Sequence, residues 1–324
     1  MKEIKVTFKT ITPLWIGDAW GDCKEIKPSA IMGSLRFWFE TIMYFKDILE
    51  NEDFNSKSGR FEKEVDRKKL KDFVQKYGND KMEIIKYLIN KQHIPISSVI
   101  FGATNWRSLI EIKKIEFDEN RFQDEPKGKI IPNKKWYFGS PSYQGEFAII
   151  FKVKEEILNS IFYPLLTFMD KYGFWGGKWN IGYGRLKIES IEENNIVKNS
   201  WQKSDFELFD DICFSWDELY VANDFNELLN AEKKIKFLEY FVSENSYKQS
   251  VIELIKLKMQ KRAKYREDSE YRHKVFGSTK SPPKKDLLPQ GSKVLPFIFE
   301  ENNQLKGGFL SIAGLLNLEG ESNE

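Results

Sequence analysis

The segment Tyr172–Lys187, YGFWGGKWNIGYGRLK, combines five glycines with two tryptophans, two lysines and an arginine. Glycine lets another backbone approach closely, aromatic rings stack on unpaired bases, and cationic side chains neutralise phosphates. These residue types at this density predict a loop that binds single-stranded RNA. A structural alternative stays open, in which the glycines satisfy positive φ angles and the tryptophans fill the core.

Two other glycine motifs do not fit this segment. A phosphate loop of the NTPase type requires Ser or Thr after Gly-Lys, whereas Trp179 follows Gly177-Lys178 here. A dinucleotide-binding loop requires a further glycine and then a helix. Residues 185–191, RLKIESI, instead alternate between polar and apolar types as a half-buried strand does. The sequence therefore excludes both kinds of nucleotide site in this segment.

The first helix supplies a second group of candidate residues. Pro28 and Ser29 are predicted to supply its entry and N-cap. Gly33, Arg36 and Glu40 fall away from the apolar stripe, so a small residue and a cation lie where a ligand could approach closely. The alternative for Arg36 is an i, i+4 ion pair with Glu40. The apolar stripe predicted to face a sheet consists of Ile31, Leu35, Trp38, Ile42 and Phe45.

Groups that could support catalysis or bind a metal are few. A metal-independent ribonuclease needs a histidine to move the proton of the 2′-hydroxyl, and the chain contains only His93 and His273, neither beside a second catalytic group. Asp18 and Asp22 could share a magnesium ion, but the sequence shows no convergent set of oxygen ligands. We therefore expect no catalytic residue, no metal site and no cofactor.

Composition limits the kind of partner. Lysine and arginine number 51 against 49 aspartates and glutamates, so a surface that binds nucleic acid must be a local patch. The two cysteines, Cys23 and Cys213, lie far apart and lack CxxC spacing, and the N-terminal residues lack the pattern of a signal peptide. We expect a reduced, cytoplasmic protein without a disulfide framework, zinc site or membrane span.

The order of predicted elements indicates the fold class. Strands are expected at residues 3–11, 97–101, 108–117, 146–153 and 185–191, and helices at 28–45 and 154–172. This order is typical of a ferredoxin-like (RRM-like) domain. The charge-rich residues 47–95 are predicted to form a helical insertion, and residues 118–139 a long excursion. Trp38 and Trp175 are expected in the core.

A second domain is predicted after residue 198. The expected division is 1–198 for an N-terminal ferredoxin-like domain, with the glycine-rich loop at 173–184, and 199–324 for a ferredoxin-like/helical domain, which makes the fold class α+β. Phe101-Gly102 and Phe276-Gly277 echo each other and are consistent with two related domains. The basic run 258–264 is expected to be solvated, and the run 280–285 lies in a proline-containing loop.

Segments throughout the chain resemble the RAMP superfamily of CRISPR-associated proteins, most closely the family of subunit one of the type III-B Cmr effector complex. TITPLWIGDAWG and EIKPSAIMGSLRFWFE are similar to the family's N-terminal signature, GGKWNIGYGRL to its glycine-rich loop, and YRHKVFGS to its C-terminal element. The chain departs from the family pattern at Lys178-Trp179-Asn180, where an arginine pair is usual, and at Arg36-Phe37-Trp38, where Arg-Trp-Trp is usual.

The resemblance implies a noncatalytic RNA-binding subunit that contacts CRISPR RNA near its 3′ end, single-stranded target RNA, or both, together with other Cmr subunits. Two alternatives stay open: a metal-independent endoribonuclease that processes CRISPR repeat RNA, and a purely structural assembly subunit. Bases would stack on exposed aromatic side chains near the sheet, and cations would hold phosphates. The predicted RNA-binding residues are Lys27, Arg36, Lys178, Trp179, Arg185, Arg272 and Lys274.

Overall fold

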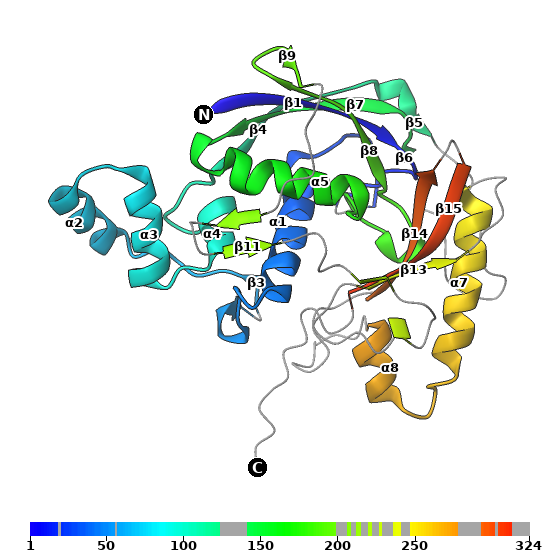
Figure 1. The fold of residues 1–324 in the computed structure, drawn as a ribbon. Helices are drawn as coiled ribbons and strands as arrows, with labels where there is room; N and C mark the ends of the chain where they lie inside the picture. The colour runs from blue at the N-terminus through cyan, green and yellow to red at the C-terminus, as the bar shows by residue number, and fades with distance from the viewer. Residues whose placement is uncertain are drawn as a thin grey trace.

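Helices and strands are mixed along the chain in the computed structural model, as the sequence predicts for the α+β class (Figure 1). The largest sheet is five-stranded and antiparallel, with strand order β4-β7-β1-β8-β9. The structure describes residues 1–18, 21–55, 57–123, 141–198, 206–208, 212–214, 220–221, 227–228, 236–240, 247–277, 293–301 and 304–312.

Four of the five strands are long. Apolar and polar residues alternate along them, so one face of the sheet is buried. In β1 the residues Ile4, Val6 and Phe8 are fully buried and alternate with more exposed residues. Val6 lies opposite Ile149 on one side and Ile191 on the other, so the apolar faces of three strands align. The strands are β1 (Lys2–Thr10), β4 (Ile110–Phe117), β7 (Glu146–Val153) and β8 (Leu186–Glu193), with the short β9 (Ile196–Val197) at the edge.

Two helices, α1 (Pro28–Phe45) and α5 (Tyr163–Lys171), lie on the same side of the sheet and contact each other (Figure 1). Ile31, Leu35, Trp38 and Ile42 are all fully buried, which confirms the predicted stripe as far as Ile42. The predicted N-cap is wrong by two residues, because the helix begins at Pro28 and Lys27 is the N-cap, without a side-chain hydrogen bond. The second helix is irregular at its start, with a 3₁₀ turn at Glu155–Ile157 and a π turn at Leu158–Phe162.

The other face of the sheet carries ion pairs between neighbouring strands. Glu3 lies 2.7 Å from the Nζ atom of Lys113 and 3.9 Å from that of Lys152, and Lys5 lies 3.5 Å from Glu116. Such exposed pairs contribute little to stability, about 0–1 kcal/mol each. They place charged groups across β4, β7 and β1 on this face of the sheet.

The residues predicted as a helical insertion do contain a helical hairpin. The helices α2 (Arg67–Tyr77) and α3 (Lys81–Gln92) contact each other, and the ring of Phe73 stacks on that of Tyr87 at 4.0 Å. Asp66 and Asp80 cap their amino ends through backbone amides. Before this hairpin lie a 3₁₀ turn (Asn51–Asp53) and the paired strands β2 (Phe54–Asn55) and β3 (Arg60–Phe61).

The strand predicted at residues 97–101 is wrong. These residues form the buried helix α4 (Ile96–Phe101), which begins after Pro95 and ends at Gly102. A short apolar run between a proline and a glycine fits a buried helix as well as a buried strand, so periodicity alone cannot distinguish the two. The predicted excursion 118–139 begins with a 3₁₀ turn (Glu119–Arg121) and β5 (Phe122–Gln123), which pairs with β6 (Ser142–Tyr143), and residues 124–140 lie outside the described part.

A second sheet, with strand order β12-β13-β15-β14, lies beside the first (Figure 1). The residues on its two faces belong to different cores. Leu295 and Phe297 belong to the core of the first sheet, whereas Val294 and Ile298 belong to a second core that includes residues of α7. The elements are β12 (Tyr220–Val221), β13 (Lys236–Tyr240), α7 (Tyr247–Ala263), α8 (Ser269–Phe276), β14 (Val294–Glu301) and β15 (Gln304–Ser311), preceded by the paired strands β10 (Phe206–Leu208) and β11 (Ile212–Phe214). The domain boundary at residue 198 stays a prediction.

The two sheets share an arrangement that extends the echo seen in the sequence. The strands β13, β14 and β15 pair in the order β13-β15-β14, just as β1, β4 and β7 pair in the order β1-β7-β4. In each case a long helix follows the first strand and a short helix ending in Phe-Gly precedes the second, although β2, β3, α2 and α3 also lie between α1 and α4. Gly102 has φ 89° and ψ 154°, and Gly277 has φ 85° and ψ 164°, so both end their helices in the same conformation.

Candidate functional site

The glycine loop, residues 173–184, is fixed by backbone hydrogen bonds at three points. The N–H of Trp175 donates to the carbonyl of Gly184 at 2.8 Å, and the N–H of Gly184 donates to that of Pro13 at 2.9 Å. The N–H of Gly177 donates to the carbonyl of Trp15 at 2.8 Å. The loop is thereby held against residues 11–18, which follow β1.

Close backbone contacts explain two of the glycines. A Cβ atom on Gly184 would lie 2.0 Å from the carbonyl oxygen of Trp175, and one on Gly176 would lie 2.5 Å from that of Trp15. Both glycines also have positive φ angles, 86° and 71°. At these two positions the glycines therefore have a structural role, as the alternative interpretation of the sequence proposed. Trp175 and Trp38 are buried as predicted.

Lys178 and Trp15 form the outer part of the loop surface. The Nζ atom of Lys178 lies 4.6 Å from the ring centroid of Trp15, a cation–π contact, and both side chains are half-buried. A Cβ atom on Gly17 or Gly177 would overlap the Trp15 ring, at 2.2 and 2.9 Å, so the ring fills a notch between two glycines. The sequence-based prediction missed Trp15, although an aromatic residue two positions before Gly17 in a loop was a usable signal.

Trp179 lies in the same surface and is also half-buried. Its ring meets Phe37 edge-on at 5.1 Å and stacks near Trp38 at 5.9 Å, while the next residue, Asn180, is exposed. One part of the indole therefore belongs to the core and another part to the surface. A ring that is held by contacts with Phe37 and Trp38 and is also partly exposed could serve as a stacking surface for a base.

The helix α1 borders the loop. The N–H of Gly176 donates to the Oγ atom of Ser34 at 3.0 Å, and a Cβ atom on the neighbouring Gly33 would have no atom within 4 Å. Lys27 lies at the amino end of this helix with its side chain one-third exposed, and its Nζ atom is 3.7 Å from Glu25. The predicted open position at Gly33 therefore exists, and it lies next to the loop.

Arg185 does not face solvent. It is 1% exposed, and its guanidinium donates to the carbonyls of Ile298 at 3.1 Å, Lys171 at 2.9 Å and Asp170 at 3.3 Å, and also to that of Gly173. Burial lowers the pKa of Arg185 to about 9, so the group remains a cation at neutral pH. Arg185 links the carboxyl end of α5, the glycine loop and β14, and we do not retain it as an RNA contact.

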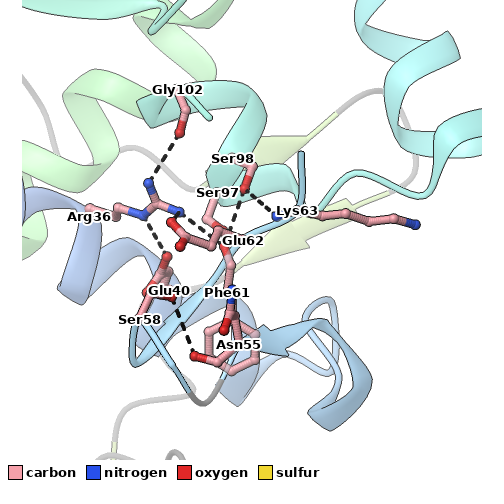
Figure 2. A network of polar contacts seen from close by, with 10 residues as sticks. All are labelled: Arg36, Glu40, Asn55, Ser58, Phe61, Glu62, Lys63, Ser97, Ser98 and Gly102. Carbon is pink, nitrogen blue, oxygen red and sulfur yellow. Dashed lines mark hydrogen bonds and ion pairs between the residues drawn. The ribbon is translucent and has the colours of Figure 1, made fainter. Parts of the chain in front are cut away.

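Arg36 is likewise buried within a polar network (Figure 2). Its Nε atom lies 2.7 Å from Glu40, the partner that the sequence offered as the alternative, and its other nitrogens donate to the carbonyls of Phe61 and Gly102. The carboxylate of Glu62 lies 3.7 Å away. Burial raises the pKa of Glu40. Arg36 joins α1 to the strand β3 and to the end of α4, so we do not retain it as an RNA contact either.

The last two predicted residues lie on α8. Arg272 is half-buried, and the side chain of Lys274 lies outside the part that the structure describes. The predicted residues therefore do not gather in one cluster. Lys178 and Trp179 lie in the loop surface with Lys27 on the adjoining helix, Arg36 and Arg185 are interior, and Arg272 belongs to the α7–α8 corner.

Lys258 corrects the prediction that the basic run 258–264 is solvated. This lysine is 3% exposed and its ammonium donates to the carbonyl of Val294. Burial, followed by the nearby charge of Arg262, lowers the pKa of Lys258 from 10.5 to about 7. The basic run 280–285 lies outside the described residues.

The pKa of Lys258 predicts how stability depends on pH. Above pH 7 the folded protein releases a proton that the unfolded chain keeps up to about pH 10.5, so the free energy of unfolding should rise with pH, by at most about 1.4 kcal/mol per unit. Urea unfolding at pH 7, 8 and 9 should show this slope in the native sequence. The slope should be smaller in Lys258→Met, and equal slopes in the two proteins would contradict the assignment.

The histidines and the aspartate pair occupy separate places. His93 is exposed at the carboxyl end of α3, whereas His273 is buried in α8. The carboxylate of Asp18 accepts the N–H of Asp22 at 2.9 Å, and Asp22 lies 3.1 Å from Lys24. Among the described residues, no group of three or more His, Cys, Asp or Glu side chains could hold a metal ion. Within the same residues, no helix has the length and apolar character needed to cross a membrane.

Comparison with known families identifies the chain. The sequence model of the RAMP superfamily matches residues 7–187, more than half of the 324 residues. The chain belongs to the RAMP superfamily. The match begins within β1 and covers the first helix and the glycine loop through the first residues of β8. It includes the N-terminal signature and the glycine-rich loop that suggested the family, whereas the segment YRHKVFGS lies outside it. A search of curated proteins by sequence finds no match.

Two solved structures illustrate what this RAMP protein is similar to. The crystal structure of Cmr1 from Pyrococcus furiosus in its apo form has 14% sequence identity and a TM-score of 0.44, covering 96% of this chain and 88% of that one. A chain in the cryo-EM structure of the type III-B Cmr-beta complex bound to cognate target RNA has 11% identity and a TM-score of 0.45, covering 97% of this chain and 98% of that one.

Proposed function

We propose that this RAMP protein is a noncatalytic RNA-binding subunit of a type III-B CRISPR (Cmr) complex in the cytoplasm. Its partners would be other Cmr subunits and single-stranded RNA, either CRISPR RNA near its 3′ end or target RNA. Superfamily membership and the similarity of the three motifs support the assignment. The observation that carries it is the loop surface, where Trp15, Lys178 and Trp179 lie beside the open position at Gly33.

We infer that both halves are ferredoxin-like. The strand order β8-β1-β7-β4, with α1 after β1 and α5 after β7, supports this for the first half. The repeated order β13-β15-β14 and the matching Phe-Gly helix ends support a related second half. In the second half β12 runs parallel to β13, whereas β8 runs antiparallel to β1, so the two units differ at that edge.

The proposed binding mode uses stacking and charge. An unpaired base would stack on the open part of Trp179 or Trp15, and Lys178 would neutralise a neighbouring phosphate. The backbone hydrogen bonds that hold the loop fix these groups before RNA arrives, which reduces the entropy lost on binding. Lys27, at the amino end of α1, would contact the strand as it leaves the loop.

Lys178→Glu should weaken the binding of single-stranded RNA at least about tenfold, equivalent to about 1.4 kcal/mol, because a phosphate contact becomes a repulsion. Trp179→Leu keeps apolar contact with Phe37 and Trp38 but removes the stacking surface, worth about 1–3 kcal/mol per base. The measurement is fluorescence anisotropy with labelled single-stranded RNA, duplex RNA and single-stranded DNA at about 50 and 200 mM salt.

Lys68→Glu is the matched control, because Lys68 is exposed on α2 and the substitution changes the net charge equally. It should leave the affinity within about twofold of the native value. Equal losses in Lys68→Glu and Lys178→Glu would assign the effect to net charge and remove the loop surface from the proposal. If the native protein binds no RNA at low salt, the assembly role replaces the proposed function. Cleavage of the probe, abolished by His93→Ala or His273→Ala, would establish the endonuclease.

A further inference from the structure

The corner between α7 and α8 brings cationic side chains together. Lys258 and Arg262 lie one turn apart on α7, and Arg272 lies on α8. The chain turns after α7 so that α8 lies beside its carboxyl end (Figure 1), and the ring of Tyr265 in this turn lies 5.0 Å from that of Tyr271. The two helices therefore hold the cations in a fixed relation.

Arg262 and Arg272 have no acidic partner in the described part of the chain. Both are half-buried, and the structure shows no ion pair for either guanidinium within 4.0 Å there. The Nε atom of Arg272 is buried and lacks a hydrogen-bond partner among the same residues. Burial lowers the pKa of Arg262, and the charge of Arg272 on the neighbouring helix lowers it further.

The helices themselves do not compensate for both charges. Arg262 lies in the last turn of α7, where the negative end of the helix dipole stabilises a cation. Arg272 lies in the first turn of α8, where the dipole disfavours a cation. The nearby carboxylate of Asp268 accepts the N–H of Tyr271 at 2.9 Å and caps that helix. A bound anion that contacts the accessible part of the Arg272 side chain would reduce the repulsion between the two cations.

We propose that Arg262 and Arg272 together bind one phosphate group of the RNA backbone, as a second contact separate from the glycine loop. Two planar guanidinium groups with several N–H donors match the oxygens of a phosphate. The identity of the ligand as RNA rests on the proposed function, whereas the presence of a phosphate site rests on the α7–α8 corner alone. Lys258, one turn before Arg262 on α7, donates to the carbonyl of Val294.

The first test uses inorganic phosphate as the probe. The thermal midpoint of the native protein should rise when phosphate replaces chloride at constant ionic strength, because phosphate binds the folded state. The double variant Arg262→Gln/Arg272→Gln should lose this rise, and its midpoint without phosphate should not fall, because the repulsion is gone. Arg266→Gln removes an exposed arginine from the same corner and should keep the rise. No rise in the native protein, or an equal rise in the double variant, would overturn the site.

The second test asks whether RNA supplies the phosphate. The slope of log affinity for single-stranded RNA against log salt should become less negative by about 0.7 in the double variant, the value for one phosphate on a single strand. Arg262→Lys/Arg272→Lys should keep most of the slope. If the native protein binds RNA and the double variant has an unchanged slope, the RNA contact is wrong and the proposed function stands. A phosphate-dependent rise without RNA binding would instead support the site and contradict the proposed function, and would point to an acidic segment of a partner subunit.

Discussion

Arg185→Met should lower the free energy of unfolding by about 3–5 kcal/mol, because it removes one member of a buried polar arrangement and leaves the rest in place. The carbonyls of Gly173, Lys171 and Ile298 would lose their donor. Asp170, whose pKa burial already raises, would lose the nearest compensating charge. Urea unfolding at pH 7, followed by tryptophan fluorescence, measures the change.

Two control variants separate this effect from a general loss of charge or packing. Arg185→Lys keeps the cation but offers fewer donors in a less suitable geometry, so we expect an intermediate loss. Lys187→Met removes an exposed cation two residues away and should change stability by less than about 0.5 kcal/mol. A loss below about 1 kcal/mol in Arg185→Met would show that the carbonyls find other donors.

Patterns of local periodicity predicted much of the fold. The strands β1 and β7 and the helix α1 occupy the expected residues, because alternation and the 3.6-residue stripe report directly on burial against a sheet. Trp38 and Trp175 were placed in the core for the same reason. The failure at α4 shows the limit of this method, since Ile96–Phe101 is too short to display a period.

The candidate site was predicted less well, because charge alone does not reveal orientation. Arg185 directly follows Gly184, and Arg36 lies three residues after Gly33, and closeness to a small residue suggested contact with a ligand. Their partners are carbonyls far away in sequence, such as those of Gly102 and Ile298, which no local pattern indicates. The prediction that Lys258 is solvated failed for the same reason. Its partner is the carbonyl of Val294 in β14, which lies 36 residues later in the chain. Lys178 and Trp179 are half-buried in the loop surface, and their contact with RNA stays a prediction.

Gly184→Ala should lower the free energy of unfolding by about 2–5 kcal/mol. The left-handed conformation at φ 86° contributes about 1–2 kcal/mol of this loss for a residue with a Cβ atom, and the overlap with the Trp175 carbonyl at 2.0 Å contributes about 1–3 kcal/mol. The carbonyl cannot turn away freely, because the N–H of Gly176 in the same peptide group donates to the Oγ atom of Ser34. Urea unfolding gives the stability, and anisotropy with single-stranded RNA reports whether the loop surface survives.

Gly33→Ala is the matched control, since it adds the same methyl group to a glycine in the same surface. Gly33 lies in α1, and its Cβ atom would meet nothing within 4 Å, so alanine should stabilise the protein by about 0.5–1 kcal/mol. The two variants therefore shift stability in opposite directions. If RNA approaches the helix at Gly33, as we propose, Gly33→Ala should weaken binding while the fold becomes more stable. Unchanged RNA affinity in Gly33→Ala would place the RNA away from α1 and confine the interface to the loop. A small loss of unfolding free energy in Gly184→Ala would show that the loop backbone can shift.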